Sequence, residues 1–286
     1  MVQYWAILPA RNMSSAGPKK FDPWKVKIFS NDCCFTDDTV MTIATKYAVL
    51  KGVPYAKAYG VFGRKYPNVG YGTMFKRWID SYCERGYNSY GNGSAMRVSF
   101  IGEHFDTLKK VEDEAQKSAL CTHNHPEGVK GAQVIAGCGY LAKNGASKKE
   151  IKSYVQKKFG YSLNKRLSFY RVFSRFDMSC QKSVPLALQC FLESDSWEEC
   201  IRNVFSVRCD TDTIGAIAGG IADAYFHGTG FDEDALLRQF LIKPNKFGAM
   251  DPFLYQWVIA KQEEVVSHHN SYHLPVKTSL KNSSIR

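Results

Sequence analysis

Two short clusters of aspartate and threonine hold the residue types in this sequence that could do chemistry. Thr36-Asp37-Asp38-Thr39 precedes one helical apolar pattern, and Asp210-Thr211-Asp212-Thr213 precedes another. Their carboxylates and hydroxyls are hard oxygen donors, which suit Mg²⁺ or Mn²⁺ rather than zinc. If the two clusters met, four carboxylates would converge, and a cation would be needed to make that charge tolerable.

Each cluster also has a purely structural explanation. Thr36 occupies the position of a helix N-cap, and the two aspartates after it would complement the positive end of the helix dipole. About 170 residues separate the clusters, so their spacing does not show that they meet in the folded chain. The pattern by itself leaves a capped helix and a metal site as alternatives.

Two further stretches place polar residues where a ligand could bind. Residues 89–97 read Ser-Tyr-Gly-Asn-Gly-Ser-Ala-Met-Arg, and their two glycines would let the backbone approach a ligand and present amide donors. A plain turn explains Asn-Gly equally well. Thr122 and His123 precede Pro126, which suits the first turn of a helix, and a single loop histidine is more often polar surface. The residue types by themselves do not decide whether either stretch binds a ligand or has only a structural role.

Taken together, the four motifs resemble those of the ADP-ribosylglycohydrolase family, which includes the dinitrogenase-reductase-activating glycohydrolase. The resemblance covers about residues 22–241, with the motifs intact and in the family's order. It implies an all-α fold, a compact single-domain orthogonal helical bundle with a dinuclear metal cleft for two divalent cations, Mg²⁺ or Mn²⁺. The implied metal ligands are Thr36, Asp37, Asp38, Asp210, Asp212 and Thr213. The implied ADP-ribose site comprises Ser89, Tyr90, Gly91, Asn92, Gly93, Met96 and His123.

The function that the resemblance implies is removal of ADP-ribose from modified protein side chains, by cleavage of an N- or O-glycosidic bond at the anomeric carbon. Water would attack through an oxocarbenium-like transition state, with Asp37, Asp38 and Asp212 as candidate catalytic carboxylates. The family's opening segment carries Gly-Asp and a loop with a catalytic glutamate, whereas residues 1–20 contain no acidic residue. We therefore expect impaired activity; the alternative is a catalytically impaired ADP-ribose-binding or structural protein on the same scaffold.

Helical periodicity accounts for most of the chain, and we find no convincing pair of strands. We expect a divergent N-terminal segment over residues 1–21, an ADP-ribosylglycohydrolase-like domain over 22–247, and a divergent, partly loose extension over 248–286. Gly215, Gly219 and Gly220 fall inside the last strongly periodic helix. They indicate close helix packing or a ligand against that face, because glycine is unfavourable within helices.

The composition of the sequence limits the compartment, the metal and the partners that can be expected. No apolar run approaches the roughly 20 residues of a membrane span, and no signal-peptide pattern opens the sequence, so we expect a cytoplasmic protein without membrane contact. Nine cysteines without a Cys-x-x-Cys pair favour neither zinc nor disulfides, and Cys138 and Cys190 should pack as small apolar side chains. The expected partner is an ADP-ribosylated protein or an ADP-ribose-containing small molecule, and the expected state is a monomer.

The net charge of +11 is unevenly distributed. Between Lys143 and Arg175, ten lysines and arginines accompany one acidic residue, Glu150. Such a stretch attracts phosphate-rich partners or forms a solvated helix face. We favour the solvated face and do not expect nucleic acid, because the stretch carries no nucleic-acid motif and we expect no aromatic side chains interleaved with its cations.

Overall fold

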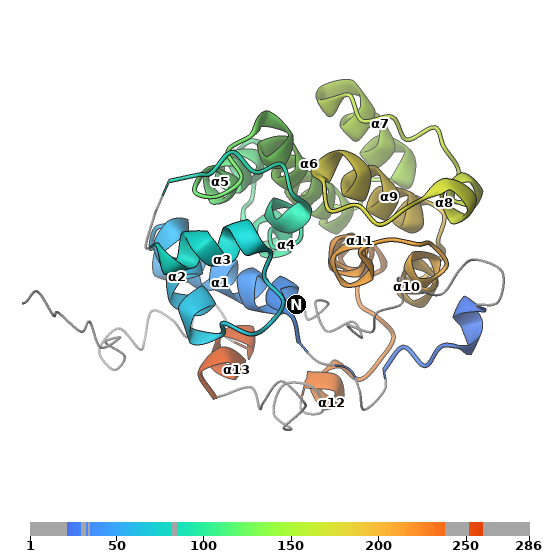
Figure 1. Ribbon diagram of the computed structural model, residues 1–286. Helices are drawn as coiled ribbons and strands as arrows, with labels where there is room; N and C mark the ends of the chain where they lie inside the picture. The colour runs from blue at the N-terminus through green and yellow to red at the C-terminus, as the bar shows by residue number, and fades with distance from the viewer. Residues whose placement is uncertain (1–21, 30–32, 34, 82–84, 238–251, 260–286) are drawn as a thin grey trace, which may run out of the picture.

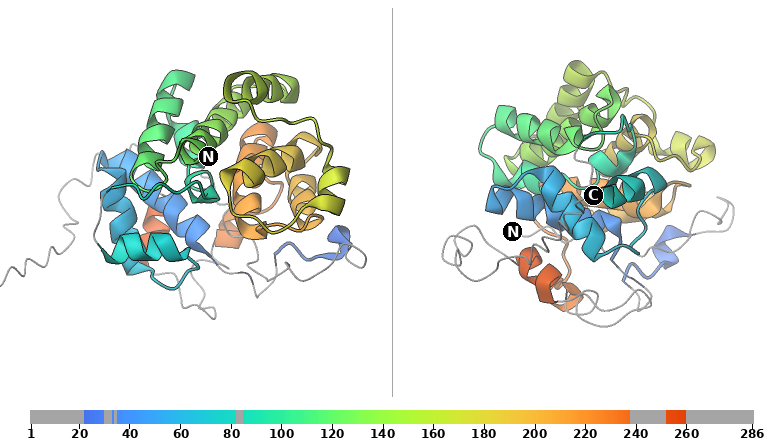
Figure 2. Two further views of the ribbon diagram at one scale, coloured as in Figure 1. Left: turned by 45° about the horizontal axis from the view of Figure 1, so that its top comes forward. Right: turned by 60° about the vertical axis from the view of Figure 1, so that its left-hand side comes forward.

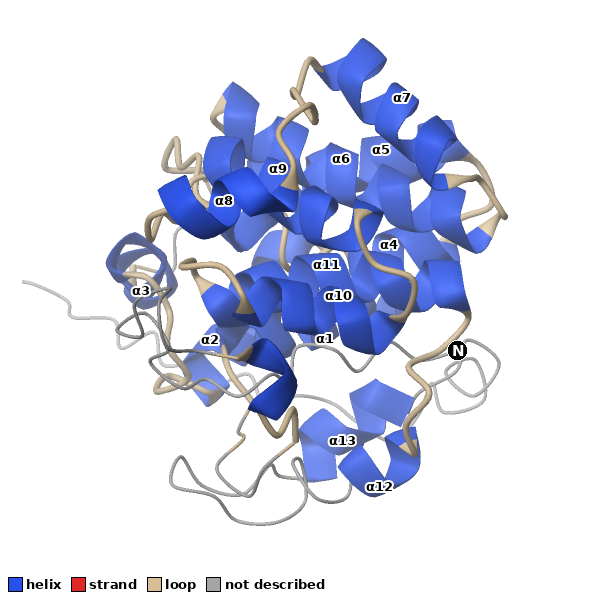
Figure 3. Cartoon of the chain, turned by 90° about the vertical axis from the view of Figure 1, so that its right-hand side faces the viewer, coloured by secondary structure: helices blue, strands red, loops and turns tan. Residues whose placement is uncertain are grey.

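The computed structural model describes residues 22–29, 33, 35–81, 85–237 and 252–259, and every regular element in these ranges is a helix (Figure 1, Figure 3). This confirms the all-α prediction. The α-helices are α1 (Asp37–Lys51), α2 (Tyr55–Lys65), α3 (Thr73–Asp80), α4 (Ser99–His104), α5 (Leu108–Leu120), α6 (Pro126–Lys143), α7 (Lys148–Phe159), α8 (Leu167–Phe173), α9 (Cys180–Leu192), α10 (Trp197–Phe205), α11 (Thr211–Phe226), α12 (Glu233–Leu237) and α13 (Pro252–Ile259). Two short 3₁₀ helices, η2 (Pro23–Lys25) and η3 (Asn92–Ser94), complete the set.

Helices α6 and α11 form the centre of the bundle, and the other helices pack around them (Figure 1, Figure 2). Glycines allow the close crossings that this requires. A Cβ at Gly102 of α4 would lie 2.5 Å from the carbonyl oxygen of Ala136 on α6. A Cβ at Gly220 of α11 would lie 3.3 Å from the Cβ of Ser99 on α4, so of the two alternatives stated for these glycines, close helix packing holds at Gly220.

Helix α13 packs against α1 and was not predicted, because the helical pattern fades after Phe247. The rings of Tyr47 and Trp257 meet edge to face with centroids 4.6 Å apart. The ammonium of Lys46 donates a hydrogen bond of 2.7 Å to the carbonyl of Val258, 212 residues further along the chain. These long-range contacts stabilise a short helix that local periodicity does not reveal.

The thiols of Cys138, Cys180, Cys190, Cys200 and Cys209 are free and buried. Cys138 and Cys190 are fully buried among apolar side chains, which confirms their expected packing role. In the part of the chain that the structure describes, none of the helices combines the length and apolar character needed to cross a bilayer.

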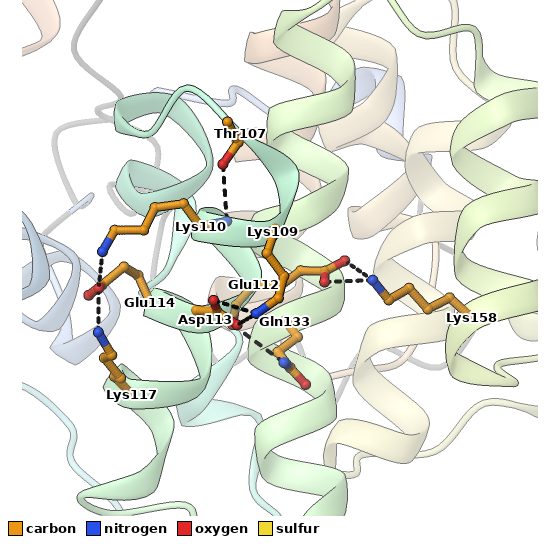
Figure 4. Close-up of polar contacts among 9 residues, drawn as sticks. All are labelled: Thr107, Lys109, Lys110, Glu112, Asp113, Glu114, Lys117, Gln133 and Lys158. Atoms are coloured by element: carbon orange, nitrogen blue, oxygen red, sulfur yellow. Dashed lines mark hydrogen bonds and ion pairs between the residues drawn. The ribbon is translucent and has the colours of Figure 1, made fainter.

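A buried carboxylate on α5 holds α7 in place (Figure 4). Glu112 is 5% exposed, and both of its carboxylate oxygens accept hydrogen bonds of 2.6 Å from the ammonium of Lys158. The hydroxyl of Tyr154, also on α7, donates to the same carboxylate at 2.8 Å. On the outer face of α5, Lys109 and Asp113 form an exposed ion pair instead.

Replacing Glu112 with alanine should therefore lower the free energy of unfolding by roughly 1–3 kcal/mol, because two donors on α7 lose a charged acceptor. Asp113→Ala is the matched control: it removes an exposed ion pair, which is typically worth less than about 1 kcal/mol. Urea unfolding followed by circular dichroism measures both values. Equal losses in the two variants would show that Glu112 does not hold α7 in place.

Candidate active site

The two acidic clusters line one cavity of about 420 Å³. Asp37 comes from the start of α1, and Asp210, Asp212 and Thr213 come from the start of α11. The loop before α3, the glycine loop around η3 and the turn before α6 form the other walls. The fold thus brings together the two clusters that sequence spacing could not connect.

The α1 cluster is held by its own hydroxyls and by the loop before α3. The Thr36 hydroxyl donates to Oδ2 of Asp38 at 2.9 Å, and the amide of Asp37 donates to the carbonyl of Val69 at 2.9 Å. Gly70 has a φ of +108°, and a Cβ there would lie 3.3 Å from Oδ1 of Asp37. Glycine at this position avoids backbone strain and lets the loop approach the carboxylate closely.

Burial and repulsion between carboxylates raise the pKa of Asp37, Asp38 and Asp210. Burial, followed by repulsion from Asp212, raises the pKa of Asp37 from 3.8 to about 7. The same two causes raise the pKa of Asp210 to about 7, against the opposing hydrogen bond from Asn92. Asp38 is 1% exposed, and burial and the other three aspartates raise its pKa well above the ordinary value. The site therefore favours a proton or a cation over four free charges.

Asn92 connects the glycine loop to both α9 and α11. Its side-chain amide donates to Oδ2 of Asp210 at 2.9 Å and to the hydroxyl of Ser183 at 3.0 Å, so both amide hydrogens are used. Its backbone amide donates to the carbonyl of Met178 at 2.7 Å. The Asn in the Gly-Asn-Gly motif thus fixes the loop relative to the acidic cluster.

The bonds that hold the glycine loop use part of its donor capacity. The amide of Gly91 donates to the hydroxyl of Ser89 at 3.1 Å, and the amide of Asn92 is bonded to Met178 as described above. The amide of Gly93 is therefore the loop's candidate donor for a ligand. The prediction that the backbone amides of Gly91–Gly93 would all be available to a ligand is therefore limited to Gly93.

A buried arginine supports the turn before α6. Arg97, the last residue of the 89–97 motif, is 1% exposed and lies over the ring of Tyr59, with 4.0 Å between the guanidinium carbon and the ring centroid. One of its nitrogens donates to the carbonyl of Ser118 at 3.0 Å and to the hydroxyl of Thr122 at 2.8 Å. The guanidinium thus fixes the hydroxyl that precedes the histidine.

The hydrogen-bond network assigns the tautomer of His123. Because Thr122 accepts from Arg97, its own hydroxyl proton can be donated to Nδ1 of His123, 2.8 Å away. Burial, together with the Arg97 charge, lowers the pKa of His123 well below its usual value, so the ring is neutral. We assign the ring proton to Nε2, which lies 3.1 Å from where a Cβ at Gly93 would be. A single N–H donor therefore faces the glycine loop.

Most predicted site residues line the cavity, and three do not. Thr36 and Asp38 are buried and are not among the residues that line it. Tyr90 is 52% exposed, and its ring packs edge to face against His125, with centroids 5.3 Å apart. The predicted residues that do line the cavity are Asp37, Ser89, Gly91, Asn92, Gly93, Met96, His123, Asp210, Asp212 and Thr213.

The loop before α3 and several other residues that line the cavity were not predicted from the sequence. The additional lining residues are Gly70, Gly72, Thr73, Met74, Phe75, Tyr87, Arg97 and Met178. The Gly-x-Gly spacing at residues 70–72 is the same as at residues 91–93, and this repetition was the available signal. No sequence pattern marks Met178 as a lining residue, because only the fold places it beside the glycine loop.

The donors fit a hard cation by their chemistry. All of them are carboxylate or hydroxyl oxygens, and Oδ1 of Asp38 is buried without a hydrogen-bond partner in the described structure. Within the described ranges, no three His, Cys, Asp or Glu side chains are already arranged as a group that could hold a metal ion. The metal ligands therefore stay a prediction.

Comparison with known proteins identifies the family. The family model of the ADP-ribosylglycohydrolases matches residues 6–239. The chain belongs to the ADP-ribosylglycohydrolase family. The match begins inside the segment 1–21, and the expected departure at residues 1–20 lies outside the residues that the structure describes.

Curated relatives agree with this assignment, and a solved structure shares the fold. ADP-ribosylhydrolase ARH3 of Bos taurus is 28% identical over 257 residues, covering 68% of this chain and 70% of that protein. The Homo sapiens protein of the same name is 28% identical over 256 residues, covering 67% and 70%. A solved ADP-ribosylglycohydrolase-related protein complex has a TM-score of 0.65 at 20% identity, covering 82% of this chain and 88% of that chain, which supports the fold.

The raised pKa values predict an unusual pH dependence of stability in chelator-treated protein. The folded chain keeps protons on Asp37 and Asp210 up to a pKa of about 7, whereas the unfolded chain releases them near 3.8. This stabilisation is complete below the unfolded pKa and is lost as pH rises through the folded pKa. The free energy of unfolding should therefore fall between about pH 4 and pH 7, on the order of 1 kcal/mol per pH unit for each proton.

Urea unfolding at several pH values, with and without Mg²⁺, measures this effect. Asp37→Asn should flatten the fall, because one titrating group is removed. Mg²⁺ should restore stability at high pH in the unaltered chain, since a ligand that binds only the folded state stabilises it. A chelated chain whose stability does not fall, or falls equally in Asp37→Asn, would show that these carboxyls are not coupled as described.

Thr122→Val tests the assignment of His123. Loss of the hydroxyl removes the donor to Nδ1, so the ring should populate both tautomers, and ¹⁵N chemical shifts of the imidazole report this directly. Thr45→Val is the matched control, because Thr45 makes a buried hydroxyl contact of 2.9 Å with Tyr59 and does not line the cavity. Unchanged ¹⁵N shifts in Thr122→Val would refute the assignment.

Proposed function

We propose that this chain is a metal-dependent hydrolase that removes ADP-ribose from modified protein side chains by cleaving the glycosidic bond at the anomeric carbon. The observation that carries the proposal is the meeting of both acidic clusters and the glycine loop in one cavity. Family membership and relatives named ADP-ribosylhydrolase support it. A cavity of about 420 Å³ is also within the usual size for a small-molecule site.

The residues that would hold two Mg²⁺ or Mn²⁺ ions are Thr36, Asp37, Asp38, Asp210, Asp212 and Thr213. Asp38 supports this choice, because its unpartnered buried oxygen would otherwise be costly. When bound, the cations would neutralise the carboxylates, orient the ribose hydroxyls and acidify the attacking water. The hydrogen bond from Thr36 to Asp38 would keep that carboxylate aimed at its ligand position.

The proton of the attacking water would pass to a carboxylate that faces the cavity. Of the three predicted catalytic residues, Asp37 and Asp212 line the cavity and Asp38 does not. Asp37 or Asp212 would therefore act as general base, a contribution typically worth about 10²- to 10⁴-fold in rate. Asp38 would instead act through the metal site.

The diphosphate of ADP-ribose would lie against the glycine loop. The amide of Gly93 and the Nε2–H of His123 would be its donors at this wall, and glycine would let phosphate oxygens approach the backbone. His123 would donate in its neutral form, so this interaction would not weaken as pH rises through the ordinary range of histidine.

The second candidate function is ADP-ribose binding without hydrolysis. It is favoured by the absence of any acidic residue in residues 1–20, where a catalytic glutamate was expected. Incubation with ADP-ribosylated arginine, ADP-ribosylserine peptide and O-acetyl-ADP-ribose, with and without Mg²⁺, separates the two. Mg²⁺-dependent release of ADP-ribose supports the hydrolase. Tight ADP-ribose binding by calorimetry with no release from any substrate would support the binding protein.

Asp212→Ala should abolish metal binding and any hydrolysis while the fold is retained. The variant loses one oxygen ligand and leaves the remaining carboxylates to repel one another. Asp195→Ala is the control, because Asp195 is a fully exposed carboxylate outside the cavity. Metal content after dialysis against Mn²⁺, measured by mass spectrometry, is the readout. Full Mn²⁺ occupancy in Asp212→Ala would remove this residue from the site.

A further inference from the structure

The helix α8 and the segment that follows it expose an unusual number of apolar side chains. Phe169, Val172, Phe173, Phe176 and Met178 are 37–62% exposed, and they make up five of the eleven large apolar side chains exposed in the described structure. The helix lies at the edge of the molecule in the views of Figures 1 and 2, and its one fully buried residue is Leu167. We call residues 165–178 the α8 surface. An exposed apolar patch of this kind marks an interaction site.

Cations alternate with these apolar side chains. Lys165, Arg166, Arg171 and Arg175 are exposed, and the Lys165 ammonium lies 4.3 Å from the ring centroid of Phe169. The one acidic residue, Asp177, has its carboxylate bonded to the backbone and side chain of Ser179. The expectation that no aromatic side chains interleave with the cations was therefore wrong. The surface presents positive charge together with apolar area.

The C-terminal end of the α8 surface forms part of the cavity wall. Met178 lines the cavity, and its carbonyl accepts the hydrogen bond from the Asn92 amide. The next two residues continue this pairing: Ser179 forms a β-bridge with Gly91, and the amide of Cys180 donates to the carbonyl of Tyr90 at 2.9 Å. A macromolecule whose ADP-ribosyl group enters the cavity would therefore extend onto the α8 surface.

We propose that the α8 surface binds the polypeptide that carries the modified side chain, and that it selects acidic sequence mixed with apolar residues. The proposal rests on the proposed function and names its substrate class. Phenylalanine, methionine and arginine are the residue types enriched where proteins meet, and four exposed cations with one engaged carboxylate favour a negative partner. Nucleic acid fits less well, because Lys165 and Phe173 already pack on the Phe169 ring and Val172 offers no stacking face.

Fluorescence anisotropy of the full chain with labelled peptides tests the surface independently of hydrolysis. One peptide mixes Asp and Glu with Leu, and its control carries Lys in place of the acids. The acidic peptide should bind roughly tenfold or more tightly than the basic one, and the preference should weaken as salt increases. Equal affinity for both peptides would overturn the proposal, as would tighter binding of single-stranded RNA or of anionic phosphatidylserine vesicles.

Substitutions on the α8 surface test whether the acidic peptide binds there. Arg166→Glu with Arg175→Glu, and separately Val172→Ser with Phe173→Ser, should each weaken acidic-peptide binding about tenfold. Lys149→Glu with Lys157→Glu on α7 is the matched control, because it changes the net charge equally at exposed positions outside the α8 surface. Loss of affinity in the α7 control equal to that in the α8 variants would show a general charge effect and overturn the assignment.

Kinetics separate this proposal from the proposed function. With an ADP-ribosylated acidic peptide, the α8 variants should raise KM, while turnover of an ADP-ribosylated single amino acid should stay unchanged. If the unaltered chain binds the acidic peptide but releases ADP-ribose from neither substrate, the proposed hydrolase is refuted. The proposed peptide-binding role of the α8 surface is then still supported. Normal release with KM unaffected by the α8 variants would refute the surface alone.

Discussion

Mutual repulsion among four aspartates is the constraint on which the rest of this structure depends. The starts of α1 and α11 lie on one cavity, so carboxylates far apart in sequence share one buried space, and the pKa of Asp37, Asp38 and Asp210 rises in consequence. A fold does not gain stability from such an arrangement without a cation or a proton. We therefore infer that the arrangement serves a ligand. Two helices that were merely capped by these residues would have no reason to bring their carboxylates together.

The surrounding scaffold fixes the positions of these charges. Glycines such as Gly102 and Gly220 allow α4, α6 and α11 to cross closely, and this packing sets the relation between the helix starts. Asn92 then fixes the glycine loop to Asp210, while Arg97 and Thr122 fix the ring of His123 beside that loop. Each ligand-facing group is thus held by a second buried polar group, which keeps a site rigid before its ligand arrives.

The sequence predicted the helices with strong periodicity and the polar residues at their starts, because those signals are local. It could not predict that the clusters of Asp37 and Asp210 meet, since this depends on packing between distant helices; only the resemblance to a family linked them. Helix α13 and the role of Met178 were missed for the same reason. The exposure of Phe169 and Phe173 was also not predicted, because their spacing alone does not say which side of α8 faces the core.

The central claim is that both helix starts contribute ligands to one site for divalent cations. Anomalous diffraction at the manganese edge, from crystals grown with Mn²⁺, tests it most directly. Anomalous peaks should appear in the cavity, within bonding distance of carboxylates from both α1 and α11. Peaks bound by one cluster alone, or found only outside the cavity, would contradict it.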